Sequence, residues 1–353
     1  MHESHTTEKY YAAANTYGGF KSYFNDVFNP SEYDKLYILK GGPGTGKSSL
    51  MKRFAKDLSV CGCRIEEIYC SSDPRSLDGI IATYNDKRIA IIDGTAPHES
   101  DAKIPGACDE IINLGIAWDS RWLSGERERI IGINKEKGQS YKSAYLSLSI
   151  AGAAHNAENA YFADLYDVKN ANIEIKRLAD SVDGHDSGST QIRLISSFCK
   201  HGLTRLNTLE SRCANIFSIV GTDYTSTRFL TDLSQEFKRR SKKITVFPSP
   251  LDPTAIEAIL IPDASTCFVV GGNGKQIDTE RFLKKDAIIS EKIKCAKECH
   301  TLALQDSMRW FSVAAELHFA LEEIYTRAMN FDIIDRIYDE KFSEVCDILK
   351  LSA

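Results

Sequence analysis

Residues 41–49 constrain the fold of this chain more than any other stretch. A short apolar run at 36–39 precedes them, and apolar residues recur at helical spacing over 50–58. The stretch fits the phosphate-loop pattern, in which two glycines separated by four residues are followed by Lys and Ser. A buried strand, a glycine-rich turn and a helix in this order predict an α/β domain with a nucleoside triphosphate site. The expected nucleotide-binding residues are Gly41, Gly42, Pro43, Gly44, Thr45, Gly46, Lys47, Ser48 and Ser49.

The residue types in this stretch suit the separate needs of a bound triphosphate. Glycine reaches backbone conformations that other residues avoid and lets the main chain come close to a phosphate. The N–H groups of residues 44–48 would then point into one concavity at the positive end of the new helix. We expect Lys47 to contact the β- and γ-phosphate oxygens and the Ser48 hydroxyl to hold Mg²⁺, so the predicted cofactors are ATP and Mg²⁺. The alternative is a glycine-rich turn that binds nothing.

Asp93 closes the apolar run 89–92, which predicts a strand. An apolar strand that ends in Asp is the Walker B form, in which the carboxylate holds Mg²⁺ opposite the Ser48 hydroxyl. Ligands of open α/β sheets gather at the carboxyl ends of the strands, where Asp93 would lie. We therefore predict Ser48 and Asp93 as metal ligands, and Lys47 and Asp93 as catalytic residues. The alternative interpretation of Asp93 is a turn aspartate.

The sequence leaves open which residue would activate water. Many ATPases carry a catalytic Glu directly after the Walker B Asp, but Gly94 stands at that position in this chain. Asp73, His98 and Glu99 are the candidates for orienting water. For each of them taken separately, the pattern favours an ordinary loop or capping role over catalysis.

Length, charge and cysteine content set the broad class of the protein. A chain of 353 residues favours two domains, and a formal net charge of −5 gives no electrostatic footprint for nucleic acid. No apolar run is long enough to span a membrane, and the first residues lack the features of a signal peptide. Ten cysteines in this context suggest reduced thiols and a cytoplasmic protein. Cys295, Cys299 and His300 lie close together, but without a second pair at zinc-site spacing we expect thiols that hold no metal.

The second half of the chain repeats the order of features of the first half. The run 216–221 matches 36–41 at an offset of 180, and a helical pattern follows both. At this offset Thr227 stands in place of the lysine and Arg228 in place of the Mg²⁺ hydroxyl, while further on Gly271 stands in place of the carboxylate. The pattern predicts an internal duplication whose second copy has lost its ligands. The alternative is that any two α/β segments share apolar strands and amphipathic helices.

The predicted fold class is α/β, with two tandem three-layer P-loop NTPase domains that carry appended helical hairpins. The first domain covers 1–186, with the intact nucleotide site and a helical arm at about 109–181. The second covers 187–353 and is a degenerate pseudo-ATPase domain with C-terminal helices. Apolar periodicity between 145 and 168 suggests that the arm is a long helical hairpin, which would act as a lid or as the surface for a protein partner. Residues 183–189 are predicted to be a polar linker.

Four segments of the chain resemble an uncharacterised group of tandem P-loop ATPase-like proteins from Gram-positive, often spore-forming, bacteria. They are GGPGTGKSSLMKRFAKDL (41–58), CSSDPRSLDGI (70–80), IAIIDGTAPHE (89–99) and PGACDEIINLG (105–115). The resemblance implies the fold and ATP binding, and it brings no settled reaction. Members of the group can keep a recognisable second phosphate loop, which this sequence lacks.

Three functions fit these observations. The first is a Mg-dependent ATPase, or an ATP-driven conformational switch, that uses the first phosphate loop. The second is a phosphotransferase that acts on a small metabolite or nucleotide, although no cluster of arginines marks a second phosphorylated substrate. The third is a scaffold that binds nucleotide without hydrolysing it, which the missing Glu after Asp93 keeps open.

Overall fold

The computed structural model describes residues 7–182, 188–284 and 291–351. The chain separates into two compact units, each of which draws segments from both sides of the expected boundary at 186/187. That boundary and most of the expected linker lie outside the described residues. Unit 1 consists of Met1–Ala12, Phe24–Ser143 and Arg309–Ala353, and unit 2 consists of Ala13–Tyr23 and Ala144–Met308.

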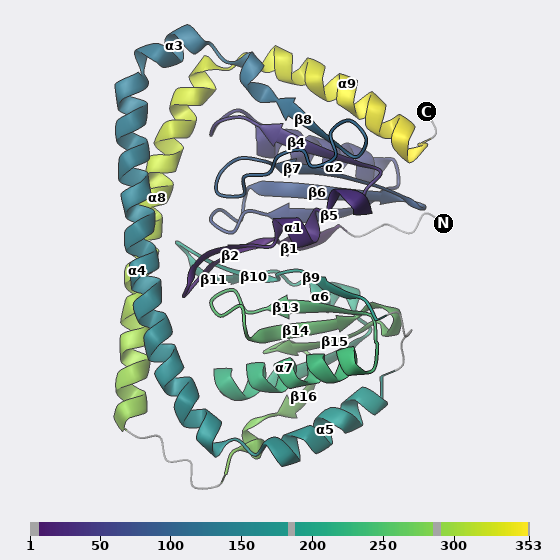
Figure 1. Ribbon diagram of the computed structural model, residues 1–353, viewed down its shortest axis with the longest axis vertical. Helices are drawn as coiled ribbons and strands as arrows, with labels where there is room; N and C mark the ends of the chain where they lie inside the picture. Colours follow the sequence, from purple (N-terminus) through teal and green to yellow (C-terminus); the bar gives the residue numbers. More distant parts are fainter. Residues whose placement is uncertain (1–6, 183–187, 285–290, 352–353) are drawn as a thin grey trace. The chain divides into compact units, whose positions relative to one another are not determined.

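Unit 1 contains a mixed sheet of six strands (Figure 1). Strand β4 lies between β7 and β8 and is parallel to both, whereas β6 is antiparallel to its neighbours β5 and β7. The carboxyl ends of β7, β4 and β8 therefore meet at one edge, where ligands of such sheets bind. In spatial order the strands are β1 (Glu8–Tyr11), β5 (Arg64–Tyr69), β6 (Leu77–Tyr84), β7 (Lys87–Asp93), β4 (Lys35–Lys40) and β8 (Asp109–Asn113).

Helices α2 (Lys47–Val60) and α9 (Phe331–Leu349) pack on the same face of this sheet and share one core with it. The two helices are tied to each other, because the Tyr338 hydroxyl donates to Asp57 Oδ2 at 2.6 Å and the Arg53 guanidinium lies 3.6 Å from the centre of the Tyr338 ring. Helix α9, from the end of the chain, thus completes the unit that contains residues 41–49. The opposite face packs in part against the short helix α1 (Phe24–Val27) and Phe28.

Unit 2 contains a second six-stranded sheet with the same strand order and the same pattern of parallel and antiparallel pairs. Helices α7 (Asp223–Arg239) and α5 (Val168–Asp180) cover one of its faces. This topology agrees with the expected repetition of features along the sequence. The strands are β9 (Thr190–Ile192), β13 (Ile244–Pro248), β14 (Ile256–Ile261), β15 (Thr266–Val270), β12 (Asn215–Val220) and β16 (Lys275–Asp278).

The remaining elements are two hairpins and a series of helices. The hairpins pair β2 with β3 and β10 with β11, and both belong to unit 2. Their bounds are β2 (Ala13–Thr16), β3 (Gly19–Ser22), β10 (Ser196–Cys199) and β11 (Gly202–Arg205). The helices are α3 (Ser120–Gly125), α4 (Arg127–Leu165), α6 (Thr208–Arg212) and α8 (Glu291–Ala328), with short 3-10 turns η1 (Pro30–Glu32), η2 (Leu114–Ala117), η3 (Pro262–Ala264) and η4 (Glu280–Phe282).

Two predictions for the arm were wrong. The stretch 145–168 is not a hairpin: it lies in the single continuous helix α4 up to Leu165, and α5 begins only at Val168. Periodic apolar residues mark a helical face without marking where a chain reverses. The expected helical region also begins with a strand, β8, whose five residues are too few to show a clear period. Within the described residues, no helix combines the length and the apolar character that a membrane span requires.

Candidate functional site

Residues 41–46 form the turn that joins β4 to α2 in unit 1. Gly44 and Gly46 have φ angles of 70° and 86°, in the left-handed region that side chains other than glycine rarely adopt. Gly46 occupies the N-cap position of α2, where it has no side chain to accept a hydrogen bond, and the helix begins at Lys47. The local structure is therefore the predicted strand, glycine turn and helix.

Lys47 and Asp93 meet at the carboxyl edge of the sheet. The register of the parallel strands β4 and β7 pairs Leu39 with Asp93, which brings the carboxylate beside the turn. Lys47 Nζ lies 3.6 Å from Asp93 Oδ2, and both side chains are largely buried, at 11% and 17% exposed. Nζ also donates to the carbonyl oxygens of Gly41 at 2.7 Å and Gly42 at 2.9 Å. Two of the predicted site residues are thus held within contact distance.

Asp93 is fixed from its other side by the loop that follows it. Its Oδ1 accepts hydrogen bonds from the Thr95 backbone N–H at 2.9 Å and from the Thr95 hydroxyl at 2.6 Å. Oδ2 faces Lys47. Thr95 on one side and Lys47 on the other thus fix the orientation of the carboxylate.

The hydroxyl residues of the turn have different surroundings. The Thr45 side chain is buried, and its hydroxyl donates to the Gly42 carbonyl at 2.8 Å, which braces the turn from inside. Ser48 Oγ accepts the backbone N–H of Leu77 at 2.9 Å, so β6 positions this hydroxyl. Ser49 is exposed and Pro43 is half-buried. The role of Ser48 as an Mg²⁺ ligand stays a prediction.

The three candidates for orienting water differ in their surroundings. His98 is buried, its Nε2 lies 3.0 Å from Asp78 Oδ2, and its ring stacks on Phe24 with centroids 4.2 Å apart. These contacts describe a packed structural histidine. Asp73 accepts hydrogen bonds from the backbone and side chain of Arg75, and Glu99 is exposed. The geometry therefore favours no single member of the three.

Helix α8 supplies contacts to the turn that the sequence analysis missed. The Thr326 hydroxyl donates to the Gly44 carbonyl at 3.2 Å. A Cβ added at Gly44 would lie 2.5 Å from the Glu322 carbonyl oxygen, so the backbones of α8 and the turn are in close contact. These residues are far from the turn in sequence, and no local pattern marks them as its neighbours.

Unit 2 lacks a turn of this kind at the corresponding position. Helix α7 already begins at Asp223, which corresponds to position 43 at the offset of 180, and Thr222 caps it by accepting the Thr225 backbone N–H. The Thr227 hydroxyl donates to the Asp223 carbonyl within the helix. Arg228 forms an ion pair with Asp232 at 2.8 Å on the same helix. The residues in place of Lys47 and Ser48 are therefore engaged in helical contacts.

A buried carboxyl group lies at the start of β14 in unit 2. Glu257 Oε1 is buried, and no hydrogen-bond partner for it occurs in the described part of the chain. Burial raises the pKa of this carboxyl group to about 8. This burial is not visible in the sequence, because a single Glu at the start of an apolar strand is usually solvated.

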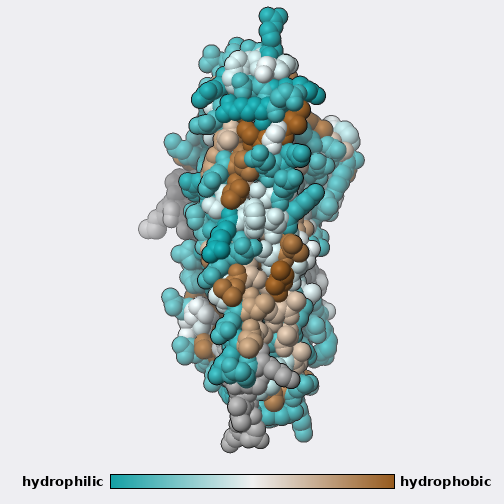
Figure 2. Space-filling model, turned by 90° about the vertical axis from the view of Figure 1, so that its left-hand side faces the viewer, coloured by the Kyte–Doolittle hydropathy of each residue, from teal (hydrophilic) through white to brown (hydrophobic). Residues whose placement is uncertain are grey.

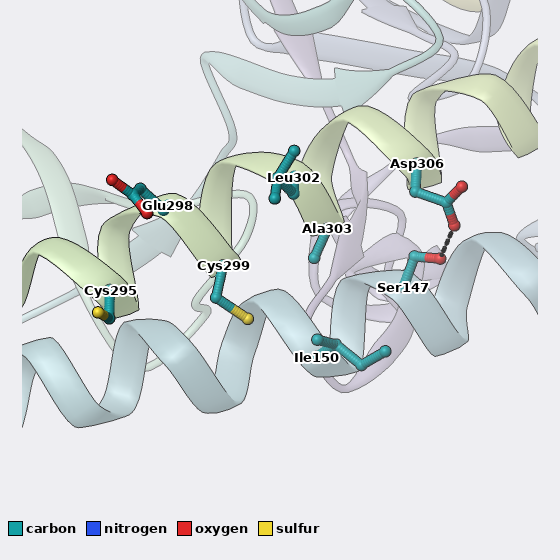
Figure 3. A pocket seen from close by; sticks show the side chains of 8 residues that line it. All are labelled: Ser147, Ile150, Cys295, Glu298, Cys299, Leu302, Ala303 and Asp306. Atoms are coloured by element: carbon teal, nitrogen blue, oxygen red, sulfur yellow. Dashed lines mark hydrogen bonds between the residues drawn. The ribbon is translucent and has the colours of Figure 1, made fainter. Parts of the chain in front are cut away.

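The cysteines near the start of α8 line an open groove of about 470 Å³ in unit 2, between α8 and α4 (Figure 3). His300 points elsewhere, since its Nε2 forms a hydrogen bond of 2.8 Å with the Tyr17 hydroxyl. Near the groove, Leu146 and Leu302 are each 65% exposed, and Figure 2 shows hydrophobic side chains interspersed among hydrophilic ones on the face that it presents. Among the described residues, no group of three or more potential ligands is arranged to hold a metal ion.

Comparison with known proteins gave no matching family model, no matching curated protein and no matching solved structure.

Proposed function

We propose that unit 1 binds Mg-ATP at residues 41–49 and hydrolyses it slowly. The observation that carries this proposal is the meeting of Lys47 and Asp93, 3.6 Å apart at the carboxyl edge of the sheet. A cation for the β- and γ-phosphates and a carboxylate for Mg²⁺ are the two charged groups that phosphoryl transfer in such sites requires. They converge on a glycine turn at the start of α2, a helix long enough to present its positive end to an anion.

Slow turnover follows from the surroundings of Asp93. Gly94 follows it directly, and the buried pair of His98 with Asp78 leaves that imidazole engaged in packing. A site that positions the triphosphate and the metal but lacks a dedicated base gains rate mainly from electrostatic stabilisation. We infer that the nucleotide acts as a switch, because α8 contacts the turn directly and a movement of the turn would be transmitted to this helix.

Substitution of Lys47 and Asp93 tests the proposal. Titration calorimetry with Mg-ATP should show that Lys47→Ala loses most of the affinity, because Lys47 is the cation that we assign to the β- and γ-phosphates. Asp93→Asn should retain nucleotide binding but need a higher Mg²⁺ concentration for turnover. Phosphate release without any added acceptor would separate an ATPase from a phosphotransferase. If both variants bind and turn over ATP as the parent does, the site assignment is wrong.

A further inference from the structure

Two aromatic rings from the end of the chain face two glycines of the turn in unit 1. A Cβ added at Gly42 would lie 3.0 Å from Cε1 of Tyr325, near the end of α8. A Cβ added at Gly46 would lie 3.5 Å from Cε1 of Phe331, the first residue of α9. The turn and the two rings are therefore immediate neighbours, although more than half of the chain separates them in sequence.

A third ring and two backbone hydrogen bonds hold this arrangement in place. The Trp118 ring lies 6.0 Å from the Tyr325 ring, centroid to centroid. The backbone N–H of Asp119 donates to Ala328 at 2.8 Å, and that of Asn330 donates to Ala117 at 2.8 Å. Trp118, Tyr325 and Phe331, which we call the aromatic wall, are thus fixed by main-chain pairing on both sides.

The order of the strands determines which side of the turn the aromatic wall occupies. Strand β4 lies between β7 and β8. Asp93 ends β7, so the metal and the terminal phosphate of a bound triphosphate would lie on the β7 side. Trp118 follows β8 through η2. The nucleoside end of the ligand would therefore leave the turn toward β8 and the aromatic wall.

Phe331 is an exposed aromatic ring beside the turn. Its side chain is 43% exposed although it is a large apolar ring beside a polar turn. The corresponding helix in unit 2, α5, also follows a polar cap residue, Asp167, but its first residue is Val168. Val168 is equally exposed, at 44%, so the difference at this one position is the aromatic ring, which unit 1 has and unit 2 lacks.

We propose that the aromatic wall binds the base of a nucleoside triphosphate by stacking, an inference that rests on the proposed function. An aromatic ring stacks on any base, because every base has a π-face. Stacking on these rings does not read the hydrogen-bonding edge of a base. Mg-ATP and Mg-GTP should therefore bind with similar affinity, and selectivity for ATP is not expected.

The experiment compares Mg-ATP with inorganic triphosphate and Mg²⁺, which fills the turn but has no base. Titration calorimetry is carried out on the parent, on Phe331→Leu and on the control Phe319→Leu. Phe319 is also exposed on α8, at 37%, but its neighbour is Arg75. We expect Phe331→Leu to weaken Mg-ATP binding about tenfold and to leave inorganic triphosphate unaffected, whereas Phe319→Leu changes neither.

Each other outcome has a distinct meaning. An equal loss for both ligands would show that Phe331 supports the turn and does not contact a base, and no loss for either would also overturn the inference. If the parent binds neither ligand, the proposed function fails and the inference with it. If the parent prefers ATP to GTP by more than tenfold, the site reads the edge of the base and stacking alone is refuted. Tryptophan emission of each variant checks that unit 1, which contains all three tryptophans, remains folded.

Discussion

A single methyl group at Gly44 tests the packing between the glycine turn at 41–46 and α8. Gly44 has a φ of 70°, and an L-residue pays about 1–2 kcal/mol in this left-handed region. The new Cβ would lie 2.5 Å from the Glu322 carbonyl oxygen and 2.7 Å from Thr326 Oγ1, so α8 would have to move. Forced displacement in a packed site costs about 1–3 kcal/mol. We expect Gly44→Ala to lower the free energy of unfolding by about 2–5 kcal/mol.

Urea unfolding followed by tryptophan fluorescence measures the free energy of unfolding of unit 1, which contains Gly44. Trp118, Trp122 and Trp310 all belong to unit 1, so the signal reports on that unit. The matched control is Gly132→Ala in α4, where nothing lies within 4 Å of the added methyl group. Alanine should stabilise that helix by about 0.5–1 kcal/mol.

Asparagine at position 44 separates the two contributions to the loss. Asn tolerates the left-handed region but carries the same Cβ, so Gly44→Asn should recover the backbone part of the loss and retain the part that comes from the contact with α8. A Gly44→Ala variant within about 0.5 kcal/mol of the parent would refute the close packing of the turn on α8.

Two further predictions concern unit 2. Burial raises the pKa of Glu257 to about 8, whereas the pKa of a Glu side chain in the unfolded chain is about 4.3. Between these values the folded protein retains a proton that the unfolded chain has lost, so stability falls as the pH rises through this range. Glu257→Gln should therefore raise the thermal stability more at pH 8 than at a pH of about 4.3. The unfolding temperatures are measured by circular dichroism, and an equal shift at the two pH values would contradict the raised pKa of Glu257. Calorimetry should also give one ATP per chain, and two sites would show that unit 2 binds nucleotide.

Two features of the candidate site could be predicted from the sequence: the strand, turn and helix of one local segment, and the meeting of residues at the ends of neighbouring parallel strands. An apolar run, a glycine turn and a helix follow one another within 36–58, so each is visible without tertiary information. The approach of Asp93 to Lys47 follows from the pairing of β7 with β4, since parallel neighbours place their carboxyl ends together. The antiparallel strand β6 is not predictable from its pattern, because Asp78 and Gly79 break its apolar run. The close contact of Phe28 with Gly79 is a tertiary effect.

The contributions from the end of the chain could not be predicted, for a different reason. Tyr325 and Phe331 occupy ordinary positions of amphipathic helices, and only the three-dimensional structure shows that their rings lie beside the turn. The composition of the units is hidden in the same way. Helix α5, from the first half of the sequence, packs on the sheet of unit 2, whereas α9, from the second half, packs on the sheet of unit 1. Helical periodicity carries no information about which sheet a helix will cover.

The two units share one topology, but within the described residues only unit 1 has a glycine turn. The difference lies in where the helix after the corresponding strand begins: α2 after β4 in unit 1, and α7 after β12 in unit 2. In unit 1, left-handed glycines at 44 and 46 prevent the helix from starting before Lys47, so the preceding N–H groups remain outside it. In unit 2 those positions are Tyr224 and Ser226, which continue the helix back to Asp223. The Ser226 N–H then donates to the Thr222 carbonyl at 3.1 Å. A lysine restored at 227 would consequently stand on a closed helix, because the backbone donors that would surround a phosphate are already used. The absence of glycines at 224 and 226, more than the absence of a lysine at 227, therefore distinguishes unit 2 from the turn of unit 1.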